Sequence, residues 1–236
     1  MNNYGFSQEM WEAYMGLVEA RPRDFRQNES LKIIFDQDAA EDFYAKTGKQ
    51  IGVTYSSHYH IMVVDLVQSP DGNRFAYERL LPAVERGAVV TVPIMEGKFI
   101  LLKQFRHSLR AEQYAFPRGF AEEGMSAEEN AKKEVEEELE SRVLETKSLG
   151  TIVADSGVSG NPVDVVMCGI DHFSLKKDYE GIQKVIALSY EELREWVASG
   201  KINDGYTLSA LTLLQMKNDS CDWMLSDCAN LEGGKL

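Results

Sequence analysis

One segment of this 236-residue chain is crowded with glutamates whose spacing suits the binding of metal ions. Seven glutamates lie between residues 128 and 140. In a helix, which turns about 100° per residue, Glu134, Glu137 and Glu138 project from one face. Like charges at these spacings disfavour a helix by ~0.2–0.5 kcal/mol per pair unless something compensates them. Hard cations such as Mg²⁺ or Mn²⁺ prefer oxygen ligands, so this face is a candidate site for a divalent cation.

The sequence also indicates where this helix begins and how it packs. Ser126 has the position of an N-cap, and Glu129 three residues later completes a capping box. A neighbouring face repeats apolar residues at every fourth position and can dock on a sheet; these are Ala127, Ala131, Val135 and Leu139. One face is therefore expected to pack while another gathers carboxylates.

A solvated surface helix is the alternative interpretation of the same segment. Glu128–Lys132 and Glu129–Lys133 are both favourable pairs at i, i+4 spacing. Runs of charge usually mark a solvated face. The helix by itself therefore leaves both a metal site and a salt-bridged surface open.

Composition and charge narrow the classes of function. With 44% apolar residues, the chain is expected to be globular and able to bury a sizeable core. A formal charge of −13 argues against a nucleic-acid-binding surface, and a polyanionic substrate would need metal ions or local arginines. Arg106 and Arg110, shortly before the acidic helix, suit phosphate oxygens; ion pairing with that helix is the alternative.

Cysteines and apolar runs bear on the compartment. Cys168, Cys221 and Cys228 have no zinc-site spacing, and their odd number gives no disulfide framework, so reduced thiols in the cytoplasm are expected. No apolar run reaches ~18 residues and no leader of the secretory type opens the chain. We therefore expect neither a membrane partner nor a signal peptide.

Residues 1–50 are expected to be mainly helical. Apolar residues recur at helical spacing, at Met10, Trp11, Tyr14, Met15 and Val18, and a second helix is expected over 36–47. Such an apolar face is either core or a dimer surface. Because large exposed patches usually mark an interface, we predict a homodimer with two-fold symmetry.

From residue 54 the apolar pattern changes to a period of two. Hairpins are expected at 60–81, around a Pro-Asp-Gly-Asn turn, and at 88–105. A short strand precedes the acidic helix, and further strands and helices follow it; we expect strands at 114–116, 148–153, 163–169 and 181–189, and helices at 190–199 and 207–217.

This order of elements carries a motif that resembles the Nudix box, G-x5-E-x7-R-E-U-x-E-E-x-G-U, in which U is aliphatic. Gly119 matches the first glycine, Glu134 follows the basic position, and Glu137 and Glu138 match the paired acids. Four positions depart from the pattern; they hold Met125 for the first Glu, Lys133 for Arg, Glu140 for the second Gly and Ser141 for the last aliphatic residue. The acids expected to bind metal are retained.

The flanking segments resemble the ADP-ribose pyrophosphatase branch of the Nudix hydrolases. KQFRHSLRAEQYAFPRGFAEEG is similar to the segment before the box in that branch, and LGTIVADSGVSGNPVDVVMCGI to its strand, glycine loop and strand after the box. EGIQKVIALSYEELREWVASGKINDGYTLSALTLLQ is similar to its closing region. The resemblance spans about residues 59–214.

The resemblance assigns the metal-binding and catalytic carboxylates. Glu134, Glu137 and Glu138, with the backbone carbonyl of Arg118, are expected to hold Mg²⁺ or Mn²⁺ and to share the catalytic work. Glu180 lies in a segment similar to the mobile loop that supplies a catalytic carboxylate in that branch; an exposed loop glutamate is the alternative.

The substrate contacts follow in the same way. Arg106 matches a substrate-contacting arginine, and Arg110 and Arg118 complete the expected substrate-binding set. Ala115 replaces a glutamate that is common in the branch, and Asn161-Pro162 stand where its glycine loop usually carries another. These two departures leave the exact substrate open.

The resemblance also implies an overall organisation and an activity. We expect an α/β/α sandwich with a mixed β-sheet, divided into an N-terminal helical extension (1–50), a Nudix hydrolase domain (51–217) and a tail (218–236). The implied activity is metal-dependent cleavage of a nucleoside diphosphate derivative, ADP-ribose or a related ADP-sugar. The alternatives are a non-catalytic Nudix domain that binds or senses nucleotide, and a structural protein that binds partners through its N-terminal aromatic residues.

Overall fold

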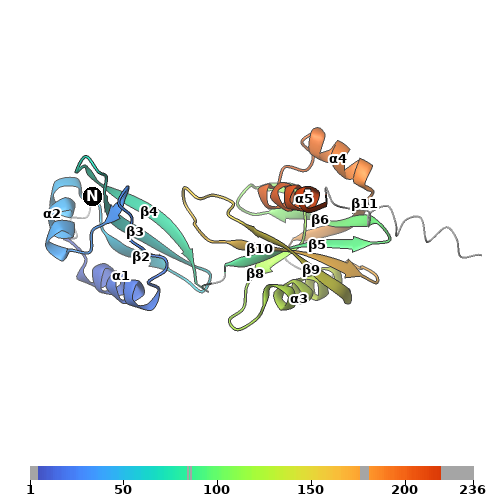
Figure 1. Ribbon diagram of the computed structural model, residues 1–236, viewed down its shortest axis with the longest axis horizontal. Coiled ribbons are helices and arrows are strands. Elements are labelled where there is room, and N and C mark those ends of the chain that lie inside the picture. The colour runs from blue at the N-terminus through green and yellow to red at the C-terminus, as the bar shows by residue number, and fades with distance from the viewer. Residues whose placement is uncertain (1–4, 84, 86, 176–180, 219–236) are drawn as a thin grey trace, which may run out of the picture. The chain divides into compact units, whose positions relative to one another are not determined.

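In the computed structural model, which describes residues 5–83, 85, 87–175 and 181–218, the chain forms two compact units (Figure 1). Unit 1 comprises the residues up to Glu85 together with Asp155–Asn161. Unit 2 comprises Arg86–Ala154 together with the residues from Pro162 on. The strands between residues 52 and 82 therefore belong to the same unit as the N-terminal helices. They pair with one another in a sheet separate from that of unit 2. The functional division into 1–50, 51–217 and 218–236 stays a prediction.

Unit 1 is built around a small antiparallel sheet, coloured blue to teal in Figure 1. Its elements are α1 (Gln8–Ala20), β1 (Lys32–Ile33), α2 (Gln37–Thr47), β2 (Gly52–Ser56), β3 (His60–Gln68) and β4 (Arg74–Pro82). β3 is central, with β4 along one edge and β2 and β1 along the other. The two predicted helices and the first predicted hairpin are confirmed.

The apolar face of α1 is covered within unit 1. Trp11 is 5% exposed and Tyr14 is fully buried, both in a core with Ile51 and Val63. α1 lies so close to β2 that a Cβ at Gly52 would overlap the Met10 carbonyl. The premise that this face is exposed and needs a second subunit is therefore wrong, because unit 1 itself covers Trp11 and Tyr14. The resemblance to the Nudix family remains as the support for a homodimer.

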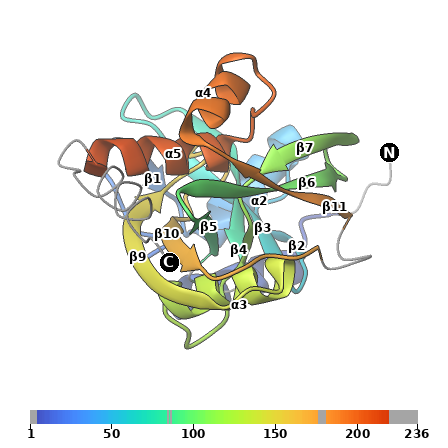
Figure 2. The same cartoon turned by 90° about the vertical axis from the view of Figure 1, so that its right-hand side faces the viewer.

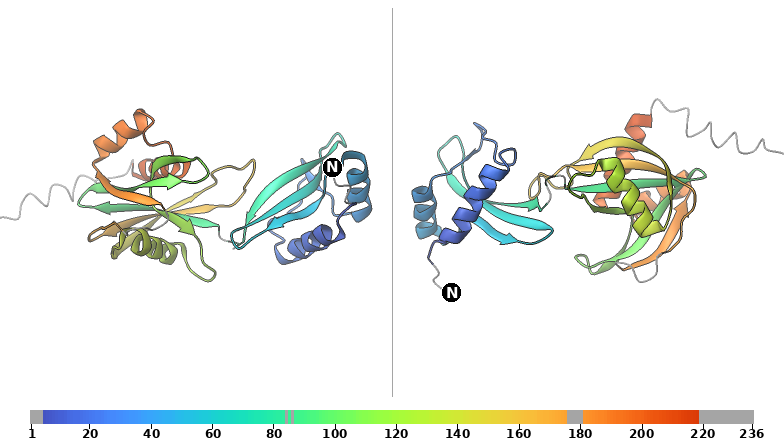
Figure 3. Two further views of the ribbon diagram at one scale, coloured as in Figure 1. Left: turned by 180° about the vertical axis from the view of Figure 1, so that it is seen from behind. Right: turned by 90° about the horizontal axis from the view of Figure 1, so that it is seen from below.

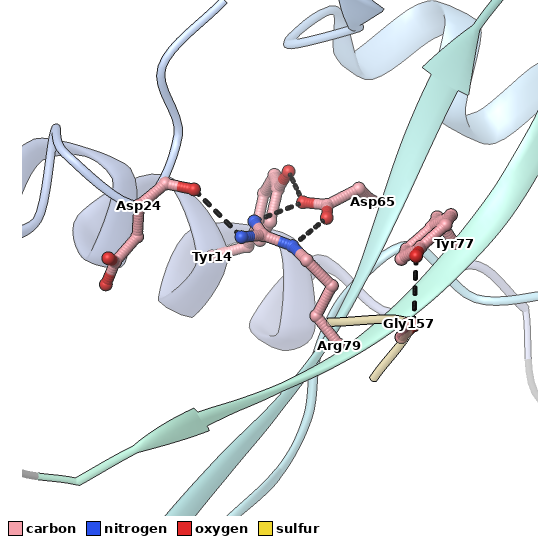
Figure 4. A network of polar contacts seen from close by, with 6 residues as sticks. All are labelled: Tyr14, Asp24, Asp65, Tyr77, Arg79 and Gly157. Atoms are coloured by element: carbon pink, nitrogen blue, oxygen red, sulfur yellow. Dashed lines mark hydrogen bonds and ion pairs between the residues drawn. The ribbon is translucent and has the colours of Figure 1, made fainter. Parts of the chain in front are cut away.

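A buried polar network joins α1 to the sheet beneath it (Figure 4). The Tyr14 hydroxyl donates to Asp65 Oδ1 at 2.5 Å, and Arg79 Nε donates to Asp65 Oδ2 at 2.5 Å. Arg79 Nη1 donates to the carbonyl of Asp24 at 2.8 Å. Burial and the neighbouring Asp65 carboxylate raise the pKa of Tyr14, so its hydroxyl stays protonated and remains a donor. The network fixes α1 on the sheet.

The segment 155–161 adds to unit 1 by pairing with β4. The Leu80 N–H donates to the Val158 carbonyl at 2.8 Å, and the Tyr77 hydroxyl donates to the Gly157 carbonyl at 2.9 Å (Figure 4). The Asn161 amide also reaches the Leu80 carbonyl, at 3.5 Å. These bonds explain why a segment that interrupts the sequence of unit 2 belongs to unit 1.

Unit 2 is a three-layer arrangement of helices and a mixed sheet. Its elements are β5 (Ala88–Met95), β6 (Lys98–Arg106), β7 (Ala111–Ala115), β8 (Arg118–Phe120), α3 (Ala127–Leu139), β9 (Val143–Ile152), β10 (Val163–Ile170), β11 (Ile182–Leu188), α4 (Tyr190–Ala198) and α5 (Gly205–Asn218). The strand order is β11-β6-β5-β10-β9; β10 pairs parallel with β5, and the other pairs are antiparallel.

Alternating residues of the sheet in unit 2 face two separate cores. Val89 and Val166 pack against α3, whereas Val90 and Val165 pack beneath α4 and α5. Figures 2 and 3 show α3 on one face of the sheet and α4 and α5 on the other. The predicted α/β/α sandwich with a mixed sheet is therefore confirmed, as are the predicted strands and helices, although β7 and β9 begin earlier in the sequence than predicted.

The chain between β6 and α3 is inserted between β5 and β6. These two strands pair with each other only at 94–95 and 98–99, next to their hairpin turn. Beyond the turn β7 pairs with β6 and β8 pairs with β5. The Pro117 carbonyl accepts hydrogen bonds from the N–H (2.9 Å) and hydroxyl (3.1 Å) of buried Thr91 in β5. The start of the acidic segment is thus anchored in the middle of the sheet.

Two further findings concern the expectations drawn from composition. None of the described helices is long and apolar enough to cross a membrane. Cys168 is a buried free cysteine, and burial raises its pKa to about 12, so the thiol stays protonated. Cys221 and Cys228 lie outside the described residues.

We expect Tyr14→Phe to destabilise unit 1 by about 1.5–3 kcal/mol, because the buried Asp65 carboxylate loses a charge-assisted hydrogen bond. Urea unfolding followed by tryptophan fluorescence measures the change. Tyr55→Phe removes a hydroxyl from a side chain that is 60% exposed and is expected to stay within about 0.5 kcal/mol of the parent. Equal effects of the two substitutions would contradict a structural role for the network.

Candidate metal and diphosphate site

The acidic helix α3 begins where the sequence predicts. Ser126 is its N-cap: its hydroxyl accepts from the Glu129 N–H at 3.2 Å, and the Glu129 carboxylate accepts from the Ser126 N–H at 2.7 Å. These hydrogen bonds lower the pKa of Glu129. Ala131, Val135 and Leu139 are buried against the sheet, as expected for the apolar face. The neighbouring carboxylates therefore have a fixed orientation relative to the strands.

Gly119 and Glu134 form the closest approach in the site. A Cβ built at Gly119 would overlap both oxygens and the carboxyl carbon of Glu134. The Glu134 carboxylate therefore lies directly over the backbone of β8, in space that any other residue at 119 would occupy. This explains the glycine without invoking its backbone freedom, because the conflict is one of space.

The three predicted metal ligands differ in their surroundings. Glu138 is 4% exposed, Glu134 faces β8, and the Glu137 carboxylate lies 3.7 Å from Lys133 Nζ with 37% of its side chain exposed. A buried carboxylate is costly unless a cation, hydrogen bonds or a proton compensates its charge. The helix that carries them is confirmed as α3, and their shared role as metal ligands stays a prediction.

The basic residue of the box, Lys133, pairs with an acid at another position than the one in the family pattern. Lys133 forms an ion pair with Glu122, three residues before Met125, the residue that replaces the first Glu of the box. The hydrogen bond with Glu122 and the charge of Glu137 raise the pKa of Lys133. An acid–base pair between the loop and the helix is therefore present, although neither of its members is the residue in the family pattern.

Asn130 is a site residue that the sequence analysis missed. It is 2% exposed, its side-chain oxygen accepts from the Glu122 N–H at 2.9 Å, and its amide donates to the Ser126 carbonyl at 2.9 Å. It thus binds both ends of the loop between β8 and α3. Its position one turn before Glu134, on a face otherwise charged, is the signal that could have revealed it.

The predicted substrate-binding arginines do not share one environment. Arg106 is the half-buried last residue of β6. Arg110 is exposed in the following turn, with φ 54°, and its Nη1 lies 2.9 Å from His107 Nδ1. The side chain of Arg118 pairs with Asp204 at 2.8 Å. Glu180, the predicted loop carboxylate, lies outside the described residues.

The donor chemistry of this face fits a hard divalent cation. Its potential ligands are carboxylate oxygens of α3 and backbone oxygens of β8, and Glu134 already lies at the boundary between these two elements. Within the described part of the chain, no three His, Cys, Asp or Glu side chains gather closely enough to hold an ion. The complete ligand set of Glu134, Glu137, Glu138 and the Arg118 carbonyl therefore stays a prediction.

Comparison with known families identifies the class. Residues 85–199 match the sequence profile of the NUDIX domain, a range that contains β5 to α4 and the whole acidic helix. The mixed sheet between helices and the glycine facing an α3 carboxylate lie within this range. The chain therefore contains a NUDIX domain, as its box-like motif indicated.

Two individual proteins refine this comparison. The chain is 27% identical over 135 residues to an ADP-ribose pyrophosphatase of Bacillus subtilis (strain 168), over 56% of this chain and 73% of that protein. The crystal structure of an ADP compounds hydrolase superposes with a TM-score of 0.62 and 20% identity, covering 71% of this chain and 91% of the other. The second similarity supports the fold, and the first supports the resemblance to the ADP-ribose pyrophosphatase branch.

We expect Gly119→Ala to lower Mn²⁺ affinity and hydrolytic activity about 10–100-fold, because the new methyl group must displace the Glu134 carboxylate. The thermal midpoint should change little, since the displaced atoms end a flexible side chain. Gly160→Ala is the control, because its added Cβ meets nothing within 4 Å. Unchanged Mn²⁺ binding in Gly119→Ala would refute the role given to this contact.

Glu140→Gly should stabilise the protein by about 1 kcal/mol, a rise of roughly 2–4 °C in the thermal midpoint. Glu140 follows α3 in a left-handed conformation, φ 49° and ψ 34°, which glycine adopts without steric cost. Its carboxylate accepts a hydrogen bond from the Ser174 hydroxyl. Glu140→Ala loses the same hydrogen bond but keeps the strained Cβ, so it should show no gain; equal midpoints would contradict the argument.

Proposed function

We propose that this protein is a metal-dependent hydrolase that cleaves the diphosphate of a nucleoside diphosphate linked to another group. ADP-ribose or a related ADP-sugar is the proposed substrate, and a nucleoside monophosphate and a phosphorylated second product are released. The observation that carries the proposal is the Glu134 carboxylate held over Gly119 within the matched NUDIX domain. The similarity to an ADP-ribose pyrophosphatase supports the choice of substrate.

The acidic helix and the arginines would divide the work between metal and substrate. Glu134, Glu137, Glu138 and the Arg118 carbonyl would hold Mg²⁺ or Mn²⁺, and the bound ions neutralise diphosphate charge and lower the pKa of water. One carboxylate of α3, or Glu180, would accept the proton of the attacking water. Cleavage would leave one phosphorus atom in the nucleoside monophosphate and the other in the phosphorylated second product.

The diphosphate also needs cationic side chains, because the chain carries a formal charge of −13. Arg106 is the last residue of β6 and Arg110 the last residue of the turn that follows; they are the proposed phosphate-binding side chains. The homodimer and the cytoplasmic location remain proposals from sequence; light scattering of the purified chain tests the first.

A nucleotide-binding Nudix domain without catalysis is the second candidate function. The observation that favours it is Glu137, which contacts Lys133 at 3.7 Å. Such a domain would bind the nucleotide without releasing a monophosphate. Chromatographic detection of AMP from ADP-ribose with Mg²⁺, and its loss on adding a chelator, distinguishes the enzyme from the binding domain.

We expect Glu138→Gln to reduce turnover about 100-fold or more while the protein stays folded. The substitution is nearly isosteric and replaces a buried charge by a neutral amide, so the metal-free thermal midpoint should stay level or rise. The increase in midpoint caused by Mg²⁺ should shrink. Glu136→Gln, on an exposed position of the same helix, is the control. Normal turnover in Glu138→Gln would contradict the ligand assignment.

A further inference from the structure

The backbone just before Gly119 is bound to the start of α5 by two contacts within unit 2. The Phe116 N–H donates to the Thr207 hydroxyl at 3.0 Å, and Arg118 Nη1 donates to Asp204 Oδ1 at 2.8 Å. Thr207 is fully buried and Asp204 is 5% exposed. Contacts buried to this degree are poorly screened by solvent and are strongly directional. α5, far away in the sequence, therefore helps to set the position of β8.

Asp204 and Thr207 act as one group. Asp204 Oδ2 accepts hydrogen bonds from the Thr207 N–H at 2.9 Å and from its hydroxyl at 2.8 Å. The Asp204 carbonyl accepts from the Leu208 N–H at 3.0 Å, so Asp204 has the place of the N-cap of α5. The negative charge is stabilised there by the helix dipole. The carboxylate that receives Arg118 is thus fixed by the helix.

The guanidinium group of Arg118 is held on a second side by an aromatic ring. Its Cζ lies 4.4 Å from the centroid of the Tyr206 ring, a cation–π arrangement. The side chain is 22% exposed. Its charge and its planar face are therefore both engaged with α5, which differs from the expectation that this side chain contacts substrate.

We propose that Asp204 and Thr207 are positioning residues of the metal site, Asp204 acting through the Arg118 side chain and Thr207 through the Phe116 N–H. This inference rests on the proposed function. The guanidinium group and the carbonyl expected to bind metal belong to the same residue, and Gly119 follows directly. Holding Phe116 and the Arg118 side chain therefore limits how far this carbonyl and the backbone facing Glu134 can move.

The opposite side of the same segment is held by the sheet. Pro117, between the two residues bound to α5, is fixed to Thr91 of β5 through its carbonyl. Three successive residues are thus held by partners from two different elements. A metal site gains affinity when its ligands are in place before the ion binds, and removing a supporting contact typically lowers affinity 10–100-fold. Asp204 and Thr207 would therefore contribute to metal binding without touching the ion.

The test measures Mn²⁺ affinity of the full chain without substrate, by electron paramagnetic resonance of the free ion, beside kcat and KM for ADP-ribose. In Arg118→Ala and Thr207→Val we expect the Mn²⁺ dissociation constant to rise about tenfold or more, with lower kcat and little change in KM. Arg118→Lys, which keeps the charge, should recover part of the affinity. Asp204→Asn keeps a good helix cap but weakens the ion pair, so it should give a smaller rise in a folded protein.

Gln113→Ala is the matched control. It removes a hydrogen bond of 3.1 Å between Gln113 and Asn203, which joins the same two segments upstream of Phe116. We expect it to lower the thermal midpoint and leave the Mn²⁺ affinity unchanged. A raised KM with unchanged Mn²⁺ affinity in Arg118→Ala would overturn the inference in favour of substrate contact. A lower thermal midpoint with unchanged affinity in all variants would also overturn it, in favour of a purely structural role.

Different results would contradict the proposed function and the positioning role of Asp204 and Thr207. If the unmodified protein binds Mn²⁺ and releases AMP but Arg118→Ala, Asp204→Asn and Thr207→Val all bind Mn²⁺ as well as it does, the proposed function stands and the positioning role is wrong. If the unmodified protein neither binds Mn²⁺ nor releases AMP, the proposed function is wrong and the inference falls with it.

Discussion

The space above Gly119 is the constraint on which the candidate site depends. The Glu134 carboxylate approaches the β8 backbone in the volume that a side chain at 119 would fill, so a residue with a Cβ there would displace this carboxylate. This approach brings a charged helix face up to the backbone of a strand that is itself inserted between β5 and β6. The apolar contacts of Ala131, Val135 and Leu139 hold the helix at this distance.

Such a close approach requires that the strand itself does not move, and the structure holds it from several directions. The start of β8 is bound to α5 through Asp204 and Thr207 and to β5 through Thr91. The loop after β8 is bound to α3 by Asn130. Elements on both faces of the sheet therefore contribute contacts to the segments on either side of Gly119.

Much of unit 2 could be predicted from the sequence, because its signals are local. The capping box of Ser126 and Glu129, the apolar runs of β5 and β6 and the spacing of the α3 acids each involve residues a few positions apart. What could not be predicted depends on partners distant in sequence. The burial of Trp11 requires the strands after residue 50, and the engagement of Arg118 requires Asp204, 86 positions away. An apolar face and an arginine each have several physically reasonable partners, and the tertiary fold alone selects one.

The departures from the Nudix pattern also have physical explanations in this chain. Lys133 pairs with Glu122, whereas the pattern has its first Glu at position 125. Glu140 takes the left-handed conformation that the pattern reserves for glycine, with a hydrogen bond from Ser174. At both positions the residue that departs from the pattern makes a polar contact of its own. At these positions the charge and the backbone conformation matter more than the identity of the residue. At Gly119, by contrast, any residue with a Cβ would have to displace the Glu134 carboxylate.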